Sequence, residues 1–355
     1  MKKLIYIKPT NSPFIVKDEE ILQSEYDVQS FLIGQNKSKI KYFFRLGSLF
    51  FYLLFRTGKA KIFVTWFGDY HAAVMVLAAR ILGKKSVFFA GGQEAICYPE
   101  LGKGVYLKKF RGNCVRYALR KTTLIIPNHE SLLYHENNYY QAGTPKIDGI
   151  KHYVKNFKTP YVVIPNGIDA KKFRREESIP KDNKMVLTVG TMNQKNDFIN
   201  KGFDLFVEAA RLNTHLHFVL ISVKSQFMPW VEEVYKVSTI PNLTIIPYFC
   251  PDEKLAEYYN RAKVFVQASI TEGMPNTLGE AMLMGCIPVG SNVNGIPDVI
   301  GNTGIVIKTR DVNELSDAIL KAIEMDTSEQ CRKRIMMKFS FGQRQEKVIE
   351  AMQSL

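Results

Sequence analysis

The stretch EGMPNTLGE, residues 272–280, constrains this chain most, because of the patterns on either side of it. Residues 262–270 before it are an apolar run rich in Val, Phe and Ile, which is typical of a buried strand in a parallel sheet. Residues 278–284 have helical spacing, and residues 286–290 are a second apolar run. The stretch is therefore expected at the carboxyl end of a strand, where ligands bind in open α/β sheets.

The residue types in this loop suit a ligand that carries both phosphate and hydroxyl groups. Gly273 and Gly279 let the backbone approach a ligand closely, and Pro275 favours the first turn of a helix. The N–H groups that follow can bind an anion, and the carboxylates of Glu272 and Glu280 bracket them. A sugar nucleotide fits this pattern, and so does an ordinary capped turn with two solvated glutamates.

Three motifs, met in order, add a resemblance to a known family. Glu272 and Glu280 match the E-x7-E signature of retaining glycosyltransferase family 4. Residues 295–300, GIPDVI, are similar to the family's G-x-P-E run, and residues 163–169, VIPNGID, followed by Phe173, resemble its inter-domain segment.

The resemblance implies a GT-B fold, an α/β architecture in which two Rossmann-like, doubly wound domains face a central cleft. It predicts an acceptor-binding domain over residues 1–165 and a nucleotide-sugar-binding domain over residues 166–330. It also predicts that residues 331–355 form a single long helix that crosses back to the first domain.

Composition agrees with two globular domains and indicates where a partner binds. The chain has 355 residues, 46% of them hydrophobic, and a net charge of +14. Residues 1–165 hold 25 Lys and Arg against 11 Asp and Glu, whereas residues 166–355 hold 23 of each, so all the excess lies in the first half. Such a field implies an anionic partner; no nucleic-acid motif accompanies it, so an anionic membrane or acceptor is expected.

The cysteines and the amino terminus indicate a cytoplasmic protein. Five Cys are scattered without a C-x-x-C pair, which argues against a disulfide framework or a zinc site. The apolar run after Met1-Lys2-Lys3 is too short for a signal peptide. No apolar run near the front is long enough to span a bilayer.

Residues 37–61 interleave basic and aromatic side chains, beginning at Lys37. A basic helix with an aromatic face can lie in a membrane interface. A buried helix with solvated, charged ends gives the same pattern. The charge asymmetry favours the membrane, and we expect the protein to lie on the inner face of the cell membrane.

Two polar residues of the first half are candidate catalytic residues: His71 could contact the acceptor or the donor sugar, and Glu94 could contact the acceptor. His71 follows a predicted strand over residues 61–66, and Glu94 follows Gly91-Gly92 at the end of another. Each also has a plain structural interpretation, because Asp69 can cap the helix that holds His71 and Gly91-Gly92 can form an ordinary turn. The first loop, residues 9–13, lacks the Gly-Gly pair of many family-4 enzymes.

The resemblance assigns the donor-binding residues to three loops of the second half. Lys201-Gly202 matches the family's diphosphate-binding Lys-Gly, but Thr191, after Gly190, stands where the family has Arg, so Lys195 or backbone N–H groups would have to substitute. Tyr248 and Phe249 lie in a loop that flanks the base in related enzymes. The signature supplies the remaining donor contacts, namely Gly273, Met274, Pro275, Asn276, Thr277, Leu278 and Glu280.

The expected chemistry is a retaining transfer of a hexose or N-acetylhexosamine from a nucleotide sugar, UDP-linked by preference, to a lipid-linked or glycan acceptor of bacterial envelope synthesis. Glu272 would hold sugar hydroxyls, Glu280 the ribose and Lys201 the diphosphate. No D-x-D pair is present to hold a metal, so no metal or other cofactor is expected. The alternatives are a GT-B epimerase or phosphorylase, or a degenerate transferase that binds membranes or polysaccharide without catalysis.

Overall fold

The computed structural model describes residues 1–34, 38–141 and 143–355, so the predicted Lys37 end of the basic segment lies outside the described residues. The chain divides into two compact units. The first unit contains residues 1–135, 147–166 and 342–355, and the second contains residues 136–146 and 167–341.

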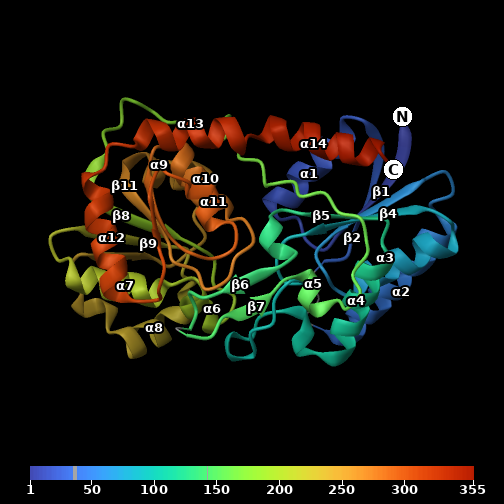
Figure 1. Cartoon of the computed structure of the whole chain (residues 1–355), viewed down its shortest axis with the longest axis horizontal. Coiled ribbons are helices and arrows are strands. Elements are labelled where there is room, and N and C mark those ends of the chain that lie inside the picture. The colour runs from blue at the N-terminus through green and yellow to red at the C-terminus, as the bar shows by residue number, and fades with distance from the viewer. Residues whose placement is uncertain (35–37, 142) are drawn as a thin grey trace. The chain divides into compact units, whose positions relative to one another are not determined.

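The first unit, in which Figure 1 labels β1, β2, β4 and β5, is built on a five-stranded parallel sheet in the order β2-β1-β3-β4-β5. Its strands are β1 (Lys2–Lys8), β2 (Tyr26–Leu32), β3 (Ile62–Trp66), β4 (Lys85–Ala90) and β5 (Leu124–Pro127). β3 is buried along its whole length, which explains its unbroken apolar sequence. Because the chain leaves β1 first toward β2 and later toward β3, the order reverses between β1 and β3, where a ligand crevice forms.

Helices flank this sheet. They are α1 (Pro13–Gln23), α2 (Lys39–Phe55), α3 (Tyr70–Ile81), α4 (Lys109–Lys121), α5 (Ile150–Tyr153) and α14 (Phe341–Gln353). α2 packs on α3, and α3 packs on α4. α2 buries Leu46, Leu49 and Leu53 on one face, but Phe44, Phe51 and Phe55 on the other face are between 61% and 76% exposed.

The second unit has a six-stranded parallel sheet in the order β10-β9-β8-β11-β12-β13. Its strands are β8 (Asp182–Val189), β9 (His217–Ile221), β10 (Leu243–Ile246), β11 (Ala262–Gln267), β12 (Ile287–Ser291) and β13 (Ile305–Ile307). Here the order reverses between the neighbours β8 and β11. The loops after these two strands therefore open toward one crevice.

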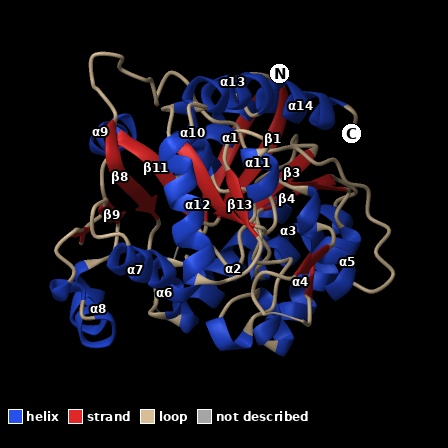
Figure 2. Cartoon of the chain, turned by 60° about the vertical axis from the view of Figure 1, so that its left-hand side comes forward, coloured by secondary structure: helices blue, strands red, loops and turns tan. Residues whose placement is uncertain are grey.

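The helices of the second unit pack around its sheet (Figure 2). They are α6 (Asn196–Asn200), α7 (Phe203–Leu212), α8 (Met228–Tyr235), α9 (Asp252–Arg261), α10 (Asn276–Leu283), α11 (Ile296–Ile300), α12 (Val312–Glu324) and α13 (Ser328–Lys338). α12 shows why its sequence forms a helix: Asp311 caps the N–H groups of Asn313 and Glu314, and Leu315 and Ile319 are buried. The predicted α/β, doubly wound architecture is thus confirmed in both units.

Three local predictions are wrong. The single helix predicted over residues 331–355 is two helices, because the backbone of Phe339 and Phe341 bonds to Ile168 (2.8 and 3.1 Å) instead of continuing the helical ladder. The Asn, Tyr, Gly, Pro and Asp residues of segment 137–150 predict a loop. Two paired strands lie there instead, β6 (His135–Asn137), which ends at its start, and β7 (Lys146–Asp148).

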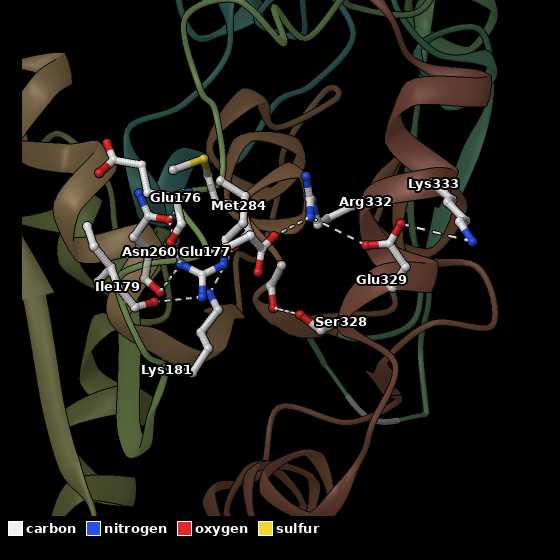
Figure 3. A network of polar contacts seen from close by, with 12 residues as sticks. Glu176, Glu177, Ile179, Lys181, Asn260, Met284, Ser328, Glu329, Arg332 and Lys333 are labelled. Atoms are coloured by element: carbon white, nitrogen blue, oxygen red, sulfur yellow. Dashed lines mark hydrogen bonds and ion pairs between the residues drawn. The ribbon is translucent and has the colours of Figure 1, made fainter.

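The third concerns residues 171–184, whose charged residues and Pro180 predict a linker between the domains. The structure instead makes this segment part of the second unit (Figure 3). Arg175 donates to Asn260 Oδ1 (2.8 Å), and Arg332 donates to Glu177 (3.1 Å). Lys181 donates to the carbonyls of Tyr259, Ala262 and Met284 at 2.8 to 3.0 Å. Burial lowers the pKa of the Lys181 ammonium, and these carbonyls satisfy all three of its N–H groups.

Candidate active site

Lys201 and Glu272 form the centre of the candidate site in the second unit. Lys201 lies between α6 and α7, beyond the end of β8, and Glu272 follows β11, so the reversal of strand order brings both to one edge of the sheet. Lys201 Nζ lies 2.6 Å from Glu272 Oε2, and the two side chains are 23% and 21% exposed. A cation and a carboxylate, partly shielded yet open to solvent, can contact an anionic diphosphate and sugar hydroxyls respectively.

The sequence motifs that lie far apart in the chain meet around this pair. The Glu272 N–H donates to Asn294 Oδ1 (3.1 Å), and the Gly295 N–H donates to the Gly273 carbonyl (3.0 Å). A Cβ on Gly279 would lie 2.8 Å from the Ile168 side chain, so glycine is required for that contact. Residues from all three motifs therefore lie together.

The signature loop leads into α10, which begins at Asn276, two residues earlier than the sequence indicates. Pro275 precedes the first turn without a side-chain cap, and Thr277 Oγ1 contacts Gln267 Oε1 at 3.2 Å. Glu280 accepts a hydrogen bond from the Tyr259 hydroxyl (3.3 Å), which orients the carboxylate predicted to hold the ribose. Met274 and Leu278 are buried and pack into the core of the unit.

The other predicted donor residues lie at the same sheet edge. Gly190 lies directly after β8, and a Cβ there would come within 3.0 Å of the Phe203 ring. Thr191 is exposed. The Lys195 ammonium lies 5.4 Å from the Trp230 ring centre, in a cation–π contact.

Tyr248 and Phe249 follow β10 and are 54% and 71% exposed. Exposed rings at this edge can stack on a ligand, and neither is part of the core of the unit.

The first unit has a cavity of about 500 Å³ where the strand order of its sheet reverses. We call it the polar cavity, because Asp69, His71 and Arg111 are among its lining residues. It is lined by residues that follow four of the strands, among them Thr10, Gly34, Phe67, Asp69 and Gln93. Thr10 and Ser12, which stand where many related enzymes have Gly-Gly, line it and contact each other at 2.8 Å.

His71 lines the polar cavity, as its position after β3 suggests. Its Nε2 lies 3.0 Å from the Trp66 carbonyl, so Nε2 carries the hydrogen and donates it. Burial lowers the pKa of His71, and the nearby Asp69 carboxylate opposes that shift. The ring is therefore neutral near pH 7, with Nδ1 available as a hydrogen-bond acceptor.

Glu94 is fully buried, and its carboxylate accepts hydrogen bonds from three backbone N–H groups, those of Gly68 (3.2 Å), Gly91 (2.5 Å) and Gly92 (3.1 Å). Burial raises the pKa of this carboxyl group, and the N–H donors oppose the shift. The geometry gives Glu94 a positioning role, because it joins the loops after β3 and β4. Direct contact with an acceptor stays a prediction.

An ion pair in the polar cavity was not identified from the sequence. Arg111 Nε and Nη2 donate to the two oxygens of Asp69 at 3.0 and 2.9 Å. Asp69 also caps the Tyr70 N–H (2.8 Å), as its position predicts. Forty-two positions separate the two residues in the sequence, so no local sequence pattern predicts their contact.

Comparison with known proteins identifies the second unit. Residues 183–325 match the family model "Glycosyl transferases group 1". The second unit is a group 1 glycosyltransferase domain. Lys201, Glu272 and the motifs at residues 272–280 and 295–300 all lie within the matched residues of this glycosyltransferase domain.

Solved structures show the fold of the whole chain. Sucrose-phosphate synthase from Thermosynechococcus elongatus has a TM-score of 0.75 at 15% identity, over 99% of this chain and 98% of that one. Anabaena Alr3699/HepE, in complex with UDP and glucose, has a TM-score of 0.70 at 14% identity, over 100% of both chains. The predicted GT-B fold is confirmed.

Curated relatives match over shorter segments. The O-antigen chain mannosyltransferase B of Escherichia coli is 38% identical over 79 residues, which are 22% of this chain and 21% of that protein. One component of the phosphatidylinositol N-acetylglucosaminyltransferase of Arabidopsis thaliana is 23% identical over 167 residues, 46% of this chain and 36% of that protein. The match thus spans between a fifth and two fifths of these relatives.

Two further observations concern the described residues alone. Within residues 1–34, 38–141 and 143–355, no helix is both long enough and apolar enough to cross a membrane. Across the same part of the chain, no group of three His, Cys, Asp or Glu side chains is placed to hold a metal ion.

Proposed function

We propose that this glycosyltransferase moves a hexose or N-acetylhexosamine from a nucleotide sugar to a lipid-linked or glycan acceptor, with retention at the anomeric carbon. The observation that carries the proposal is the Lys201–Glu272 pair (2.6 Å) at the strand-order reversal, directly before the start of α10. The UDP and glucose bound by Alr3699/HepE support a UDP-sugar as the first donor to test. The E. coli mannosyltransferases support envelope polysaccharide as the pathway.

Each group has a role that its chemistry allows. Lys201 and the first N–H groups of α10, those of Asn276 and Thr277, stabilise the negative charge that develops on the departing diphosphate. Glu272 accepts hydrogen bonds from sugar hydroxyls and fixes the ring, and Glu280 does the same for the ribose. Because Lys201 and the helix start supply this charge, we propose that the transfer needs no divalent metal.

The first unit binds the acceptor in this proposal. The polar cavity offers Thr10, His71, Gln93 and the Asp69–Arg111 pair to a hydroxylated ligand. The exposed aromatic face of α2 and the excess of Lys and Arg in residues 1–165 support attachment to an anionic membrane surface.

A panel of UDP-, GDP- and ADP-sugars tests the proposal, with release of the nucleotide measured in EDTA for the wild type and Glu272→Ala. We expect one donor to be consumed without metal and the variant to be inactive. Consumption that requires Mg²⁺ or Mn²⁺ would refute metal independence. If no donor is consumed while anionic vesicles are still bound, the degenerate, non-catalytic alternative is correct. Recovery of an epimerised nucleotide sugar would identify the epimerase alternative.

A further inference from the structure

An apolar groove of about 600 Å³ runs between α2, α3 and α4 of the first unit. Among the described residues that line it, the walls are carbon-rich and contain no Lys, Arg, Asp or Glu side chain. The residues that the argument uses are Phe43, Gly47, Tyr70, Leu77, Phe110 and Tyr117. The groove lies on the same face of the unit as the exposed rings of α2, since Phe43 and Gly47 also line a second apolar hollow with Phe44 and Phe51.

The groove shares a wall with the polar cavity. On each of three segments, one residue lines the polar cavity and the next or preceding residue lines the groove; the pairs are Tyr42–Phe43, Asp69–Tyr70 and Arg111–Phe110. The Tyr70 ring lies 5.8 Å from the rings of Phe43 and Phe110 and 6.3 Å from that of Tyr42. A ligand whose head occupies the polar cavity therefore has an apolar channel directly beside it.

Gly47 keeps this groove open. It lies inside α2, where glycine costs about 1 kcal/mol relative to alanine. A Cβ there would meet no atom within 4 Å, so packing within the unit does not require glycine. The empty space beside Gly47 is part of both the groove and the neighbouring hollow.

We propose that the groove binds one apolar chain of an amphiphilic acceptor whose polar head lies in the polar cavity; this rests on the proposed glycosyl transfer and selects the lipid-linked acceptor over a free glycan. A peptide is a poor occupant, because the carbon-rich wall would leave its backbone N–H and C=O groups without partners. A hydrocarbon chain needs no such partners, and its burial is favourable by about 0.8 kcal/mol per methylene. Lys39, Lys41 and Arg45 of α2 are exposed, as are Lys108 and Lys109 at the start of α4. These positive charges lie on the helices that form the groove and would attract an anionic head group or bilayer surface.

Binding of alkyl phosphates below their micellar concentration, without vesicles, tests the groove. By titration calorimetry, we expect decyl phosphate to bind the wild type at least about tenfold more tightly than butyl phosphate, because the longer chain buries more methylenes. Gly47→Leu places a side chain in the groove, and its Cβ meets no atom within 4 Å. This variant should reduce the ratio of the two affinities, which we call the chain-length factor, toward one. Gly342→Leu, the same change at another helical glycine with open space around it, should leave the factor unchanged.

Thermal unfolding checks the fold of Gly47→Leu, and we expect this variant to be at least as stable as the wild type because leucine has the higher helix propensity. A wild type that binds both phosphates equally, or a Gly47→Leu variant that keeps the chain-length factor, would overturn the inference. Release of nucleotide from the donor panel is measured on the same proteins. If a donor is consumed but the two alkyl phosphates bind equally tightly, the proposed transferase activity is supported and the proposed role of the groove is refuted. A chain-length factor without donor consumption supports the groove and refutes the transferase.

Discussion

At the scale of single residues, the proposed function gives Lys201 the task of neutralising charge on the donor. Its ammonium lies 2.6 Å from the carboxylate of Glu272, the first residue of the signature loop. If Lys201 stabilises the departing diphosphate, Lys201→Ala should lower the turnover of the donor about 10²–10³-fold. Steady-state release of nucleotide measures this effect.

Lys184→Ala is the matched control, because Lys184 is an exposed residue at the opposite, amino-terminal end of β8. It removes the same charge from the same unit and should leave turnover unchanged. Equal losses in both variants would show that net charge, rather than the Lys201–Glu272 geometry, controls the rate.

Glu94 gives a prediction in the pH dependence of stability. Burial raises its pKa above that of the unfolded chain, so the protonated form favours the folded state. This stabilisation is complete below the unfolded pKa and is lost as the pH rises through the folded pKa. Glu94→Gln lacks the titration and leaves an amide NH₂ facing one backbone N–H, at a cost of about 1–3 kcal/mol.

Urea unfolding of the wild type and Glu94→Gln between roughly pH 4 and pH 8 measures this difference. The free energy of unfolding of the wild type should exceed that of the variant most at the acid end, and the gap should narrow as the pH rises. A gap that widens with pH would show that the ionised carboxylate is the favoured native form.

At the scale of elements, α2 presents three exposed rings, Phe44, Phe51 and Phe55. If this face enters an anionic bilayer, replacing all three by serine should weaken binding to phosphatidylglycerol vesicles at least tenfold, because each buried aromatic ring contributes about 1.5–3 kcal/mol. The stability of the unit should change little, since the rings have few contacts to lose. Vesicle sedimentation measures the binding.

Met337→Ser provides the comparison, since Met337 is an equally exposed apolar residue (71%) of α13 in the second unit. If the triple variant binds vesicles as tightly as Met337→Ser does, α2 is not the membrane face.

Elements with strong local signals could be predicted from the sequence. Apolar runs such as residues 62–66 predict strands, because both faces of a parallel sheet are buried. The helical spacing of Leu315, Ile319 and Ile323 likewise predicts the helix that the structure has as α12. The interruption between α13 and α14 could not be predicted, because it depends on hydrogen bonds to Ile168, far away in the sequence. β6 and β7 were missed for the same reason: such short strands exist only through their pairing with each other.

In the candidate site, too, the residues in local motifs could be predicted and those that depend on tertiary contacts could not. The signature at residues 272–280 and Lys201 were identified from motifs, and the structure places Glu272 and Lys201 in contact. The Asp69–Arg111 pair and the bracing of three N–H groups by Glu94 depend on tertiary contacts, which no spacing records.

At the scale of the whole molecule, the chain returns to its first unit at the carboxyl end. Arg344 of α14 forms a bidentate pair with Asp18 of α1 (2.6 and 2.7 Å), and both are almost fully buried. Trp66 donates to the same carboxylate (2.9 Å). Arg344→Met should therefore lower the free energy of unfolding of the first unit by about 3–5 kcal/mol, because it leaves a buried charge without its partner.

The double variant Asp18→Asn/Arg344→Met removes both charges and should recover part of this loss in chemical denaturation. If the double variant instead loses more free energy of unfolding than the two single variants lose together, the pair stabilises α14 by more than charge compensation. In that case our explanation of the contact is wrong.

The proposed activity is the transfer of a sugar from a nucleotide to a lipid-linked acceptor. The most direct measurement follows a radiolabelled sugar from the donor that the panel identifies into the organic phase of a bacterial lipid extract, in EDTA, with wild type and Glu272→Gln. We predict that the wild type moves the label into lipid and that the variant does not. Label that stays on the nucleotide, while the protein still binds the extracted lipids, would contradict the claim and leave a membrane-binding protein without transferase activity.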